Sequence, residues 1–276
     1  MRFRLCQSLL SVEIGFPGAT IIPVRLVSYN ILDGGEGRAD QLAEVIESQK
    51  PDVVVLVEAD LPAVVEGIAG RLKMDFIIGD GRRHDGAILA CGRIVESVNH
   101  SVLRDEFSDL VLEATVEAAG REWAVAAVHL HPRARLEDER RREGEIDGIL
   151  EIFAPHRAEG RAHLLAGDFN ANSPVQQVII EKCKARTRQD IAANGGVLPR
   201  TAVAKLLEAG YLDTLHSVLG REAETMGSFT TQEPGQRVDY IFSHGIDAGR
   251  LRNAKIEQGR LAKDASDHFP VMVEIE

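Results

Sequence analysis

Eight apolar segments of strand length recur along the chain, with turn residues between them. They cover residues 20–30, 52–58, 85–91, 110–117, 123–130, 163–169, 238–243 and 271–275. Short apolar runs bounded by turn residues predict buried strands. Helical periodicity separates some of them, at residues 38–49, 135–153 and 201–210. Because strands and helices alternate throughout, without an internal repeat or linker, we predict one α/β domain over residues 25–276, preceded by an N-terminal extension of residues 1–24.

The composition supports a folded domain and limits its partners. With 44% hydrophobic residues, the 276-residue chain can bury a full core. A formal net charge of -11 argues against a protein that coats nucleic acid by bulk charge, and it suits divalent cations. No segment approaches the roughly 20 apolar residues that span a bilayer. The three cysteines lack metal-ligand spacing. We expect a cytoplasmic protein without a membrane span, and a monomer is assumed.

Several of the predicted strands end in a polar side chain. These residues are Asn30, Glu58, His129, His131, Asp168 and Asn170, and the later segments add Asp239, Asp267 and His268. A lone residue of this kind is more often structural, but functional groups gather at strand ends in α/β enzymes. In an extended chain, Asp168 and Asn170 would face the same side of the strand end; the alternative is an Asx-type turn.

The residue types select a chemistry. Carboxylate and carboxamide oxygens are hard ligands that suit magnesium or manganese, and histidines supply protons or hold an anion. No nucleophile elbow is visible, and the glycine-rich residues 32–37 lack the lysine and serine of a phosphate loop. Metal-assisted attack of water on a phosphoester is therefore favoured over covalent catalysis.

Two motifs, taken in order, resemble a known superfamily. GDFN at 167–170 and SDHFP at 266–270 are similar to motifs of the endonuclease/exonuclease/phosphatase group, which includes DNase I, the abasic-site endonucleases, inositol polyphosphate 5-phosphatases and neutral sphingomyelinases. The resemblance spans residues 25–276. It implies an α/β (α+β) four-layer sandwich, in which two mixed β-sheets pack face to face with helices outside, and an active site where strand ends meet at one rim.

The resemblance also implies a metal site. Glu58 corresponds to the principal Mg²⁺ ligand, and Mn²⁺ is expected to substitute for Mg²⁺. Asn30 corresponds to a residue that supports the metal or the substrate phosphate. Asp267 is placed to complete the metal or water shell.

The same resemblance implies the catalytic roles. Asp168 corresponds to the residue that activates or positions water, with Asn170 beside the water and the scissile phosphate. His268 would donate to the phosphate oxygens, and Asp239 would set its tautomer and orientation. His129 would assist the leaving group.

Some positions match the family less well. Asp85 is a loose match for a residue that orients His129. Abasic-site endonucleases place an aspartate where this chain has Leu32, and Asp33 follows one step later. His84 and His131 are expected to be peripheral.

Three functions follow, in order of preference. The first is a phosphodiesterase that acts on nucleic acid, for which basic residues give support, although a solvated helix face explains them equally well. These residues are Arg82, Arg83, Lys182, Lys184, Arg186 and Arg188. The second is a phosphatase or phosphodiesterase for a small phosphorylated metabolite or lipid headgroup, favoured by the net charge of -11 and by only 5% aromatic residues. A non-catalytic binding protein is disfavoured because every expected site residue is present.

Overall fold

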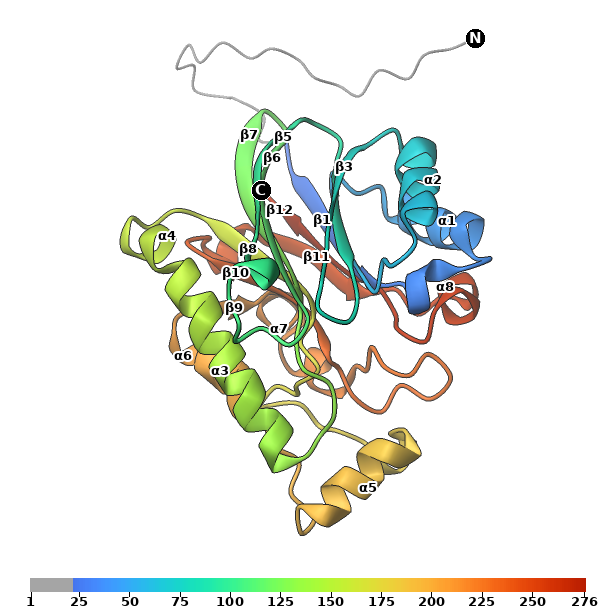
Figure 1. Ribbon diagram of the computed structural model, residues 1–276, viewed down its shortest axis with the longest axis vertical. Coiled ribbons are helices and arrows are strands. Elements are labelled where there is room, and N and C mark those ends of the chain that lie inside the picture. Colours follow the sequence, from blue (N-terminus) through green and yellow to red (C-terminus); the bar gives the residue numbers. More distant parts are fainter. Residues whose placement is uncertain (1–21) are drawn as a thin grey trace.

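The computed structural model describes residues 22–276, and within them two six-stranded sheets pack face to face (Figure 1). The first sheet has the order β11 (Leu251–Ile256), β12 (Val271–Ile275), β1 (Val24–Asn30), β2 (Val53–Val57), β4 (Gly86–Ala90) and β3 (Asp75–Gly79). The second has the order β5 (Ile94–Asn99), β6 (Leu110–Ala118), β7 (Arg121–His129), β8 (His163–Asp168), β10 (Asp239–His244) and β9 (Leu212–Asp213). Both sheets are mixed, since β1 pairs with β2 and β7 with β8 in parallel, whereas the other pairs are antiparallel.

Helices cover the outer face of each sheet. In Figure 1, α1 (Ala39–Gln49), α2 (Pro62–Leu72) and α8 (Arg260–Ala265) lie on one side of the sheets, and α3 (Leu136–Ile152), α4 (Ala154–Ala158) and α6 (Thr201–Glu208) lie on the other. Helix α5 (Ala185–Ala193) lies at one end of the molecule, and α7 (Thr214–Leu219) contacts β10 and β11. This arrangement confirms the predicted four-layer sandwich. None of the helices within residues 22–276 is long and apolar enough to cross a membrane.

The side chains of the second sheet alternate between two hydrophobic layers. On β7, Val125 and Ala127 belong to the core between the sheets, whereas Ala126 and Val128 pack in the layer beneath α3 and α6. Successive strand residues point to opposite faces, and both faces of this sheet are covered. Every second residue of a strand in this sheet therefore points toward the first sheet.

All eight predicted strands are present, and four strands were not predicted. The additional strands are β3, β5, β9 and β11, which form the two edges of each sheet. Helices α1, α3 and α6 match the predicted helical segments, and α2, α4, α7 and α8 were not predicted.

Helix α3 buries part of its charged half. Ile146 and Ile149 are buried, and Glu139, Arg142 and Glu145 are also only 1% exposed. Arg142 donates to Glu139 from Nε and Nη2, so the buried charges are paired. The predicted extension, residues 1–24, lies almost entirely outside the described residues.

Candidate active site

Three neighbouring strands of the second sheet carry one row of polar side chains. Asp168, the last residue of β8, is in register with His129 on β7 and with Asp239 on β10. The period of two directs all three side chains toward the first sheet, because alternate residues of these strands belong to the core between the sheets. Each is at most 4% exposed.

Gly167 lets β7 and β8 approach closely beside this row. Its φ is 146°, and a Cβ atom on it would lie 1.9 Å from the carbonyl oxygen of Val128. No other residue type fits such a position. The glycine of the GDFN motif is thus required by backbone packing next to Asp168.

The first sheet supplies Asn30 and Glu58. Asn30 is the last residue of β1, and Glu58 comes directly after the neighbouring parallel strand β2. Asn30 Nδ2 donates to Glu58 Oε1 at 2.9 Å and to Asp168 Oδ2 at 3.2 Å. Its Oδ1 accepts from the backbone N–H of Leu32 at 3.0 Å. The Asn30 amide therefore joins a carboxylate from each sheet, and this favours an orienting role over metal ligation.

The segment 266–268 reaches the site from the other end of the chain. Ser266 Oγ donates to the carbonyl oxygen of Asn30 at 2.8 Å. His268 Nδ1 lies 2.9 Å from Asp239 Oδ2. Burial alone would lower the pKa of His268, but the charges of Asp239 and Asp168 raise that pKa well above its usual value. The ring is consequently held as an imidazolium that can bind an anion.

Asp168 Oδ2 is the atom on which the polar side chains converge. It lies 3.7 Å from His268 Nε2 and 3.8 Å from His129 Nε2. Both separations exceed a direct hydrogen bond, so each nitrogen can still bond to a phosphate oxygen or a water. Burial, followed by the charge of Asp239, raises the pKa of Asp168. These atoms place two imidazole groups around one carboxylate.

Asp109, which was not predicted, lies beside His129. Asp109 Oδ2 lies 3.3 Å from His129 Nδ1, and both side chains are buried. The prediction that Asp85 orients His129 is wrong, because the Asp85 carboxylate accepts from the backbone N–H of Gly81 at 3.0 Å. Burial lowers the pKa of His129 to about 3 and raises that of Asp109 to about 6.

Asn170 does not continue the strand as expected. Its φ is 49°, so the chain leaves the extended conformation directly after Asp168. The backbone N–H of Asn170 donates to Asp168 Oδ1 at 2.8 Å, and its Nδ2 donates to the carbonyl oxygen of Leu130 at 2.9 Å. The Asx-type turn is therefore present, and it places both side chains at the same strand end by a route other than strand alternation.

Left-handed backbone conformations gather around this rim. Leu32, Asp33 and Glu58 have φ values of 56°, 45° and 55°. For non-glycine residues such conformations are strained, and they concentrate at functional sites. The sharp turns after β1 and β2 bring the backbone N–H of Asp33 within 3.1 Å of Glu58 Oε2.

The donor set around Glu58 fits a divalent cation. One ligand atom each from Asp33, Glu58 and His84 lie within 4.8 Å of one another. His84, expected to be peripheral, thus lies at the site, and its Nδ1 is 2.9 Å from Asp60 Oδ2. Asp267 Oδ1, among the residues described, is buried without a hydrogen-bond partner. Carboxylate oxygens of this kind suit a hard cation.

A shallow cleft of about 320 Å³ opens beside this site. Asp267 forms part of its wall, together with Arg38 and Lys263. Arg38 donates to the carbonyl oxygens of Leu32 and Ala265, so its guanidinium is held in place by the loops on either side. The cleft provides room for a group attached to a phosphate at the site.

The predicted basic stretch divides into residues with different roles. Lys184 Nζ lies 2.9 Å from Asp267 Oδ2 at the site. Arg188 instead donates to the carbonyl oxygens of Glu181 and Cys183. Within residues 22–276, Lys182 and Arg186 form no ion pair.

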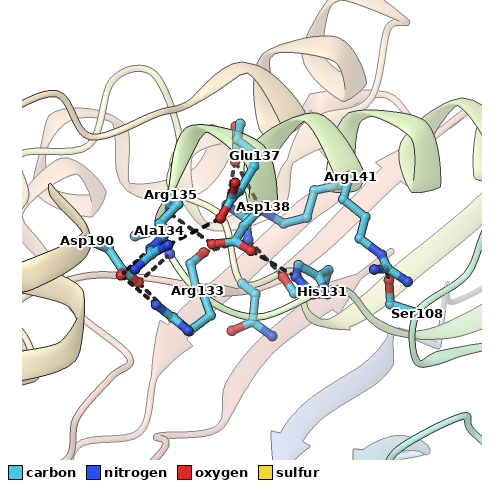
Figure 2. A network of polar contacts seen from close by, with 12 residues as sticks. Ser108, His131, Arg133, Ala134, Arg135, Glu137, Asp138, Arg141 and Asp190 are labelled. Atoms are coloured by element: carbon cyan, nitrogen blue, oxygen red, sulfur yellow. Dashed lines mark hydrogen bonds and ion pairs between the residues drawn. The ribbon is translucent and has the colours of Figure 1, made fainter. Parts of the chain in front are cut away.

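A polar network supports the loop that follows His129 (Figure 2). Figure 2 shows the Asp190 carboxylate of α5 between Arg133 and Arg135, which donate to it at 2.7 to 3.2 Å. In the same network His131 Nε2 lies 3.0 Å from Asp138 Oδ1 of α3, so His131 is a structural residue of the helix start. The loop from β7 is thereby tied to both α3 and α5.

The buried Glu145 of α3 binds the backbone next to two residues of the site. Its Oε1 accepts from the backbone N–H of Ser108 at 2.7 Å, and its Oε2 accepts from that of His131 at 3.0 Å. Ser108 adjoins Asp109, and His131 is two residues after His129. Glu145 therefore holds the backbone on both sides of the Asp109–His129 pair.

Comparison with known proteins places this geometry in context. A family model described as Endonuclease/Exonuclease/phosphatase family matches residues 27–268. No curated protein sequence matches the chain. Among similar solved structures, an AP endonuclease from Archaeoglobus fulgidus has a TM-score of 0.66 at 18% identity, covering 92% of this chain and 99% of that chain.

Two further structures show the same fold. The 3′ phosphatase NExo from Neisseria, bound to a product DNA hairpin, has a TM-score of 0.67 at 18% identity, with 92% of this chain and 99% of that chain covered. Humanized TDP2 from D. rerio has a TM-score of 0.64 at 19% identity, with the same coverage of 92% and 99%.

Proposed function

Because the chain belongs to the Endonuclease/Exonuclease/phosphatase family and is thus a phosphoester hydrolase, we propose that it is a Mg²⁺-dependent phosphodiesterase that acts on nucleic acid. The observation that carries the proposal is the convergence of His129 and His268 on Asp168 Oδ2, at 3.8 and 3.7 Å. This arrangement offers one carboxylate for a water and two imidazole groups for the oxygens of a phosphate.

The metal would be held at the Glu58 side of the rim. Asp33 and His84 lie beside Glu58, and Asp267 presents an unpartnered oxygen among the residues described. A bound Mg²⁺ would supply Lewis-acid charge to the phosphate and lower the pKa of a bound water. Mn²⁺ is expected to substitute, because it accepts the same oxygen ligands.

The remaining side chains act on the phosphate and the water. Asp168 and Asn170 position the attacking water. His268 donates from Nε2 to a phosphate oxygen as negative charge develops, while Asp239 accepts from Nδ1–H at 2.9 Å and so sets the orientation of the ring. His129 lies on the other side of Asp168 and contacts the leaving group, oriented by Asp109.

Nucleic acid is the preferred substrate for two reasons. Two of the similar structures carry DNA-related names, the AP endonuclease and the phosphatase bound to a DNA hairpin. In addition, Lys184 brings a cation to the site at 2.9 Å from Asp267. The protein is further proposed to be a cytoplasmic monomer. The odd number of cysteines fits a reducing compartment such as the cytoplasm.

A small phosphoester is the second candidate. The cleft of about 320 Å³ beside Asp267 and the net charge of -11 favour a small phosphorylated metabolite or lipid headgroup over a long polyanion. The two candidates predict different products in the same assay.

The test is a substrate screen with purified protein. Plasmid DNA, single-stranded DNA, RNA, a chromogenic phosphodiester and inositol phosphates are each incubated with Mg²⁺, Mn²⁺ or excess chelator. We expect metal-dependent cleavage of a nucleic acid and of the chromogenic diester. Release of phosphate from inositol phosphates alone would favour the second candidate, and full activity after exhaustive chelation would refute the metal mechanism.

The screen includes two site variants. Asp168→Asn and His268→Ala should each lower turnover by roughly 100-fold or more, with a smaller change in substrate binding, because each removes a group that acts mainly in the transition state. A folded variant that keeps more than about a tenth of wild-type turnover would remove that residue from the mechanism.

A further inference from the structure

Lys184 is the one lysine or arginine within residues 22–276 that pairs with a carboxylate of the candidate site. Its Nζ lies 2.9 Å from Asp267 Oδ2, and its side chain is 49% exposed. The other oxygen of the same carboxylate, Oδ1, lies 3.9 Å from His268 Nε2. Asp267 therefore lies between the ammonium of Lys184, which is open to solvent, and the buried ring of His268.

An aromatic ring connects these two groups. Lys184 Nζ lies 4.4 Å from the centroid of the Phe229 ring. That centroid lies in turn 4.4 Å from the centroid of the His268 ring. A cation over an aromatic face is attracted to it, so Phe229 adds a second contact that keeps the ammonium at the edge of the site.

The backbone that carries Lys184 is fixed to the body of the protein. The N–H of Ile179 donates to the carbonyl oxygen of Gly235 at 2.8 Å. A Cβ atom on Gly235 would lie 2.7 Å from the carbonyl oxygen of Ile179, so the two segments pack without room for a side chain. Cys183 is 2% exposed, and Arg188 donates to its carbonyl oxygen. The position of Lys184 is thus set by packing.

The negative charge of the site must be offset when a phosphate binds, and Lys184 is placed to offset it. Six carboxylates line the rim: those of Asp33, Glu58, Asp109, Asp168, Asp239 and Asp267. A substrate phosphate is repelled by those carboxylates that are ionised, and the repulsion is strong where water is excluded. The imidazolium of His268 is already paired with Asp239 at 2.9 Å. Lys184 offers three donors, of which Asp267 uses one.

We propose that Lys184 is a substrate-binding residue whose ammonium contacts a non-bridging oxygen of the phosphate that is cut. The contact is made with short and long substrates alike, unlike a cation that follows a nucleic-acid backbone at a distance. This inference rests on the proposed function, since it places the phosphate between Asp168 and His268.

The experiment compares four variants in full-length protein. Lys184→Met removes the charge and keeps the length of the side chain, Lys184→Arg keeps the charge, and Lys182→Met removes a charge from the same segment away from the site. Lys184→Gln serves as a second uncharged variant. The readouts are kcat and KM for the chromogenic diester, and the rise in thermal midpoint that inorganic phosphate produces in the presence of Mg²⁺.

Lys184→Met is expected to raise KM about tenfold, the scale of one charge-assisted hydrogen bond, with kcat within about threefold of wild type. It should also lose most of the phosphate-dependent stabilisation. Lys184→Arg and Lys182→Met should behave like wild type in both readouts.

Other outcomes overturn the inference. An unchanged KM and an unchanged phosphate effect in Lys184→Met would show that the ammonium does not contact phosphate. If Lys182→Met raised KM and lost the phosphate-dependent stabilisation to the same extent, the effect would come from the overall charge of the segment. If Lys184→Met lowered kcat at constant KM, Lys184 would only position Asp267. Because the thermal readout needs no turnover, a protein that hydrolyses none of the substrates still tests the Lys184 contact.

Discussion

Asp109 is buried beside His129 at 3.3 Å from Nδ1, although no motif surrounds it. It immediately precedes β6, and β6 lies next to β7 in the second sheet. Leu110 is in register with His129, so the residue before Leu110 lies beside the imidazole. Only the pairing of two strands reveals this neighbour, whereas the Asp85 carboxylate accepts from the backbone of its own loop.

We predict that Asp109→Asn lowers kcat by about 10- to 100-fold, because the amide cannot hold the imidazole of His129 in the same tautomer and orientation. Steady-state kinetics on the chromogenic diester provide the measurement. Asp85→Asn is the matched control and should keep wild-type kcat. Equal effects of the two substitutions would assign Asp109 a purely structural role.

The sequence was sufficient to name most residues of the candidate site. It was not sufficient to predict which of their atoms are in contact. Asn30, Glu58, Asp168, Asp239 and His268 stand in a recognisable order along the chain, and the structure brings them together. Asp109 belongs to no motif and was found only by geometry, whereas Asp33 and Lys184 were named from the sequence without their contacts at the site. Sequence spacing carries no information on such contacts.

At the scale of elements, the strands that escaped prediction share one place in the fold. β3, β5, β9 and β11 are the edge strands of the two sheets. All eight predicted strands lie between these edges. Edge strands need no continuous apolar run, because one side faces solvent. β5 shows this plainly, since four of its six residues are exposed. Hydrophobic patterning therefore finds the interior of a sheet and misses its borders.

The link between α5 and the loop after β7 depends on one carboxylate. Asp190 is 2% exposed and accepts from Arg133 at 2.7 and 2.8 Å, from the backbone N–H of Ala134 and from Arg135 (Figure 2). Hydrogen bonds from Arg133, more than the opposing effect of burial, lower the pKa of Asp190. The stabilisation it supplies is complete above the usual aspartate pKa of about 3.9 and is lost as the pH falls below that value.

We predict that Asp190→Asn lowers the free energy of unfolding by about 1 to 3 kcal/mol at pH 7, because partly exposed arginines lose a charged acceptor. Urea unfolding measures the loss, and hydrogen exchange should show faster opening of α5. The control is Glu137→Gln, which removes a 70% exposed partner of Arg135 and should cost less than about 0.5 kcal/mol. Equal losses in both variants would contradict the assignment.

At the scale of the whole molecule, protonation at the end of β8 opposite the site affects stability. His163, the first residue of this strand, is 0% exposed, and its Nε2 lies 2.7 Å from the Tyr211 hydroxyl. Burial lowers the pKa of His163 to about 4. Since an unfolded histidine titrates near 6.5, the unfolded chain binds more protons between these values, and stability falls as the pH drops from about 6.5 to 4.

We predict that this residue alone lowers the free energy of unfolding by about 2 kcal/mol between pH 7 and pH 5. The cost of His163→Gln, measured by urea unfolding, should therefore shrink by that amount over the same interval. His216→Gln on α7, where the ring is 37% exposed, is the control for the general effect of replacing a histidine by glutamine. A constant cost for His163→Gln would refute the prediction.

The Asn30 amide donates to Glu58 of one sheet and to Asp168 of the other. The geometry of the site therefore depends on the alignment of the two sheets. The contact between Asn30 and Asp168 depends on how the two sheets are positioned against each other, whereas the distance between His129 and Asp168 is set within the second sheet. A core substitution that lets the sheets slide by an ångström would leave all strands and their circular dichroism intact. Activity would nevertheless fall, so catalysis reports the alignment of the sheets more sensitively than any measure of secondary structure.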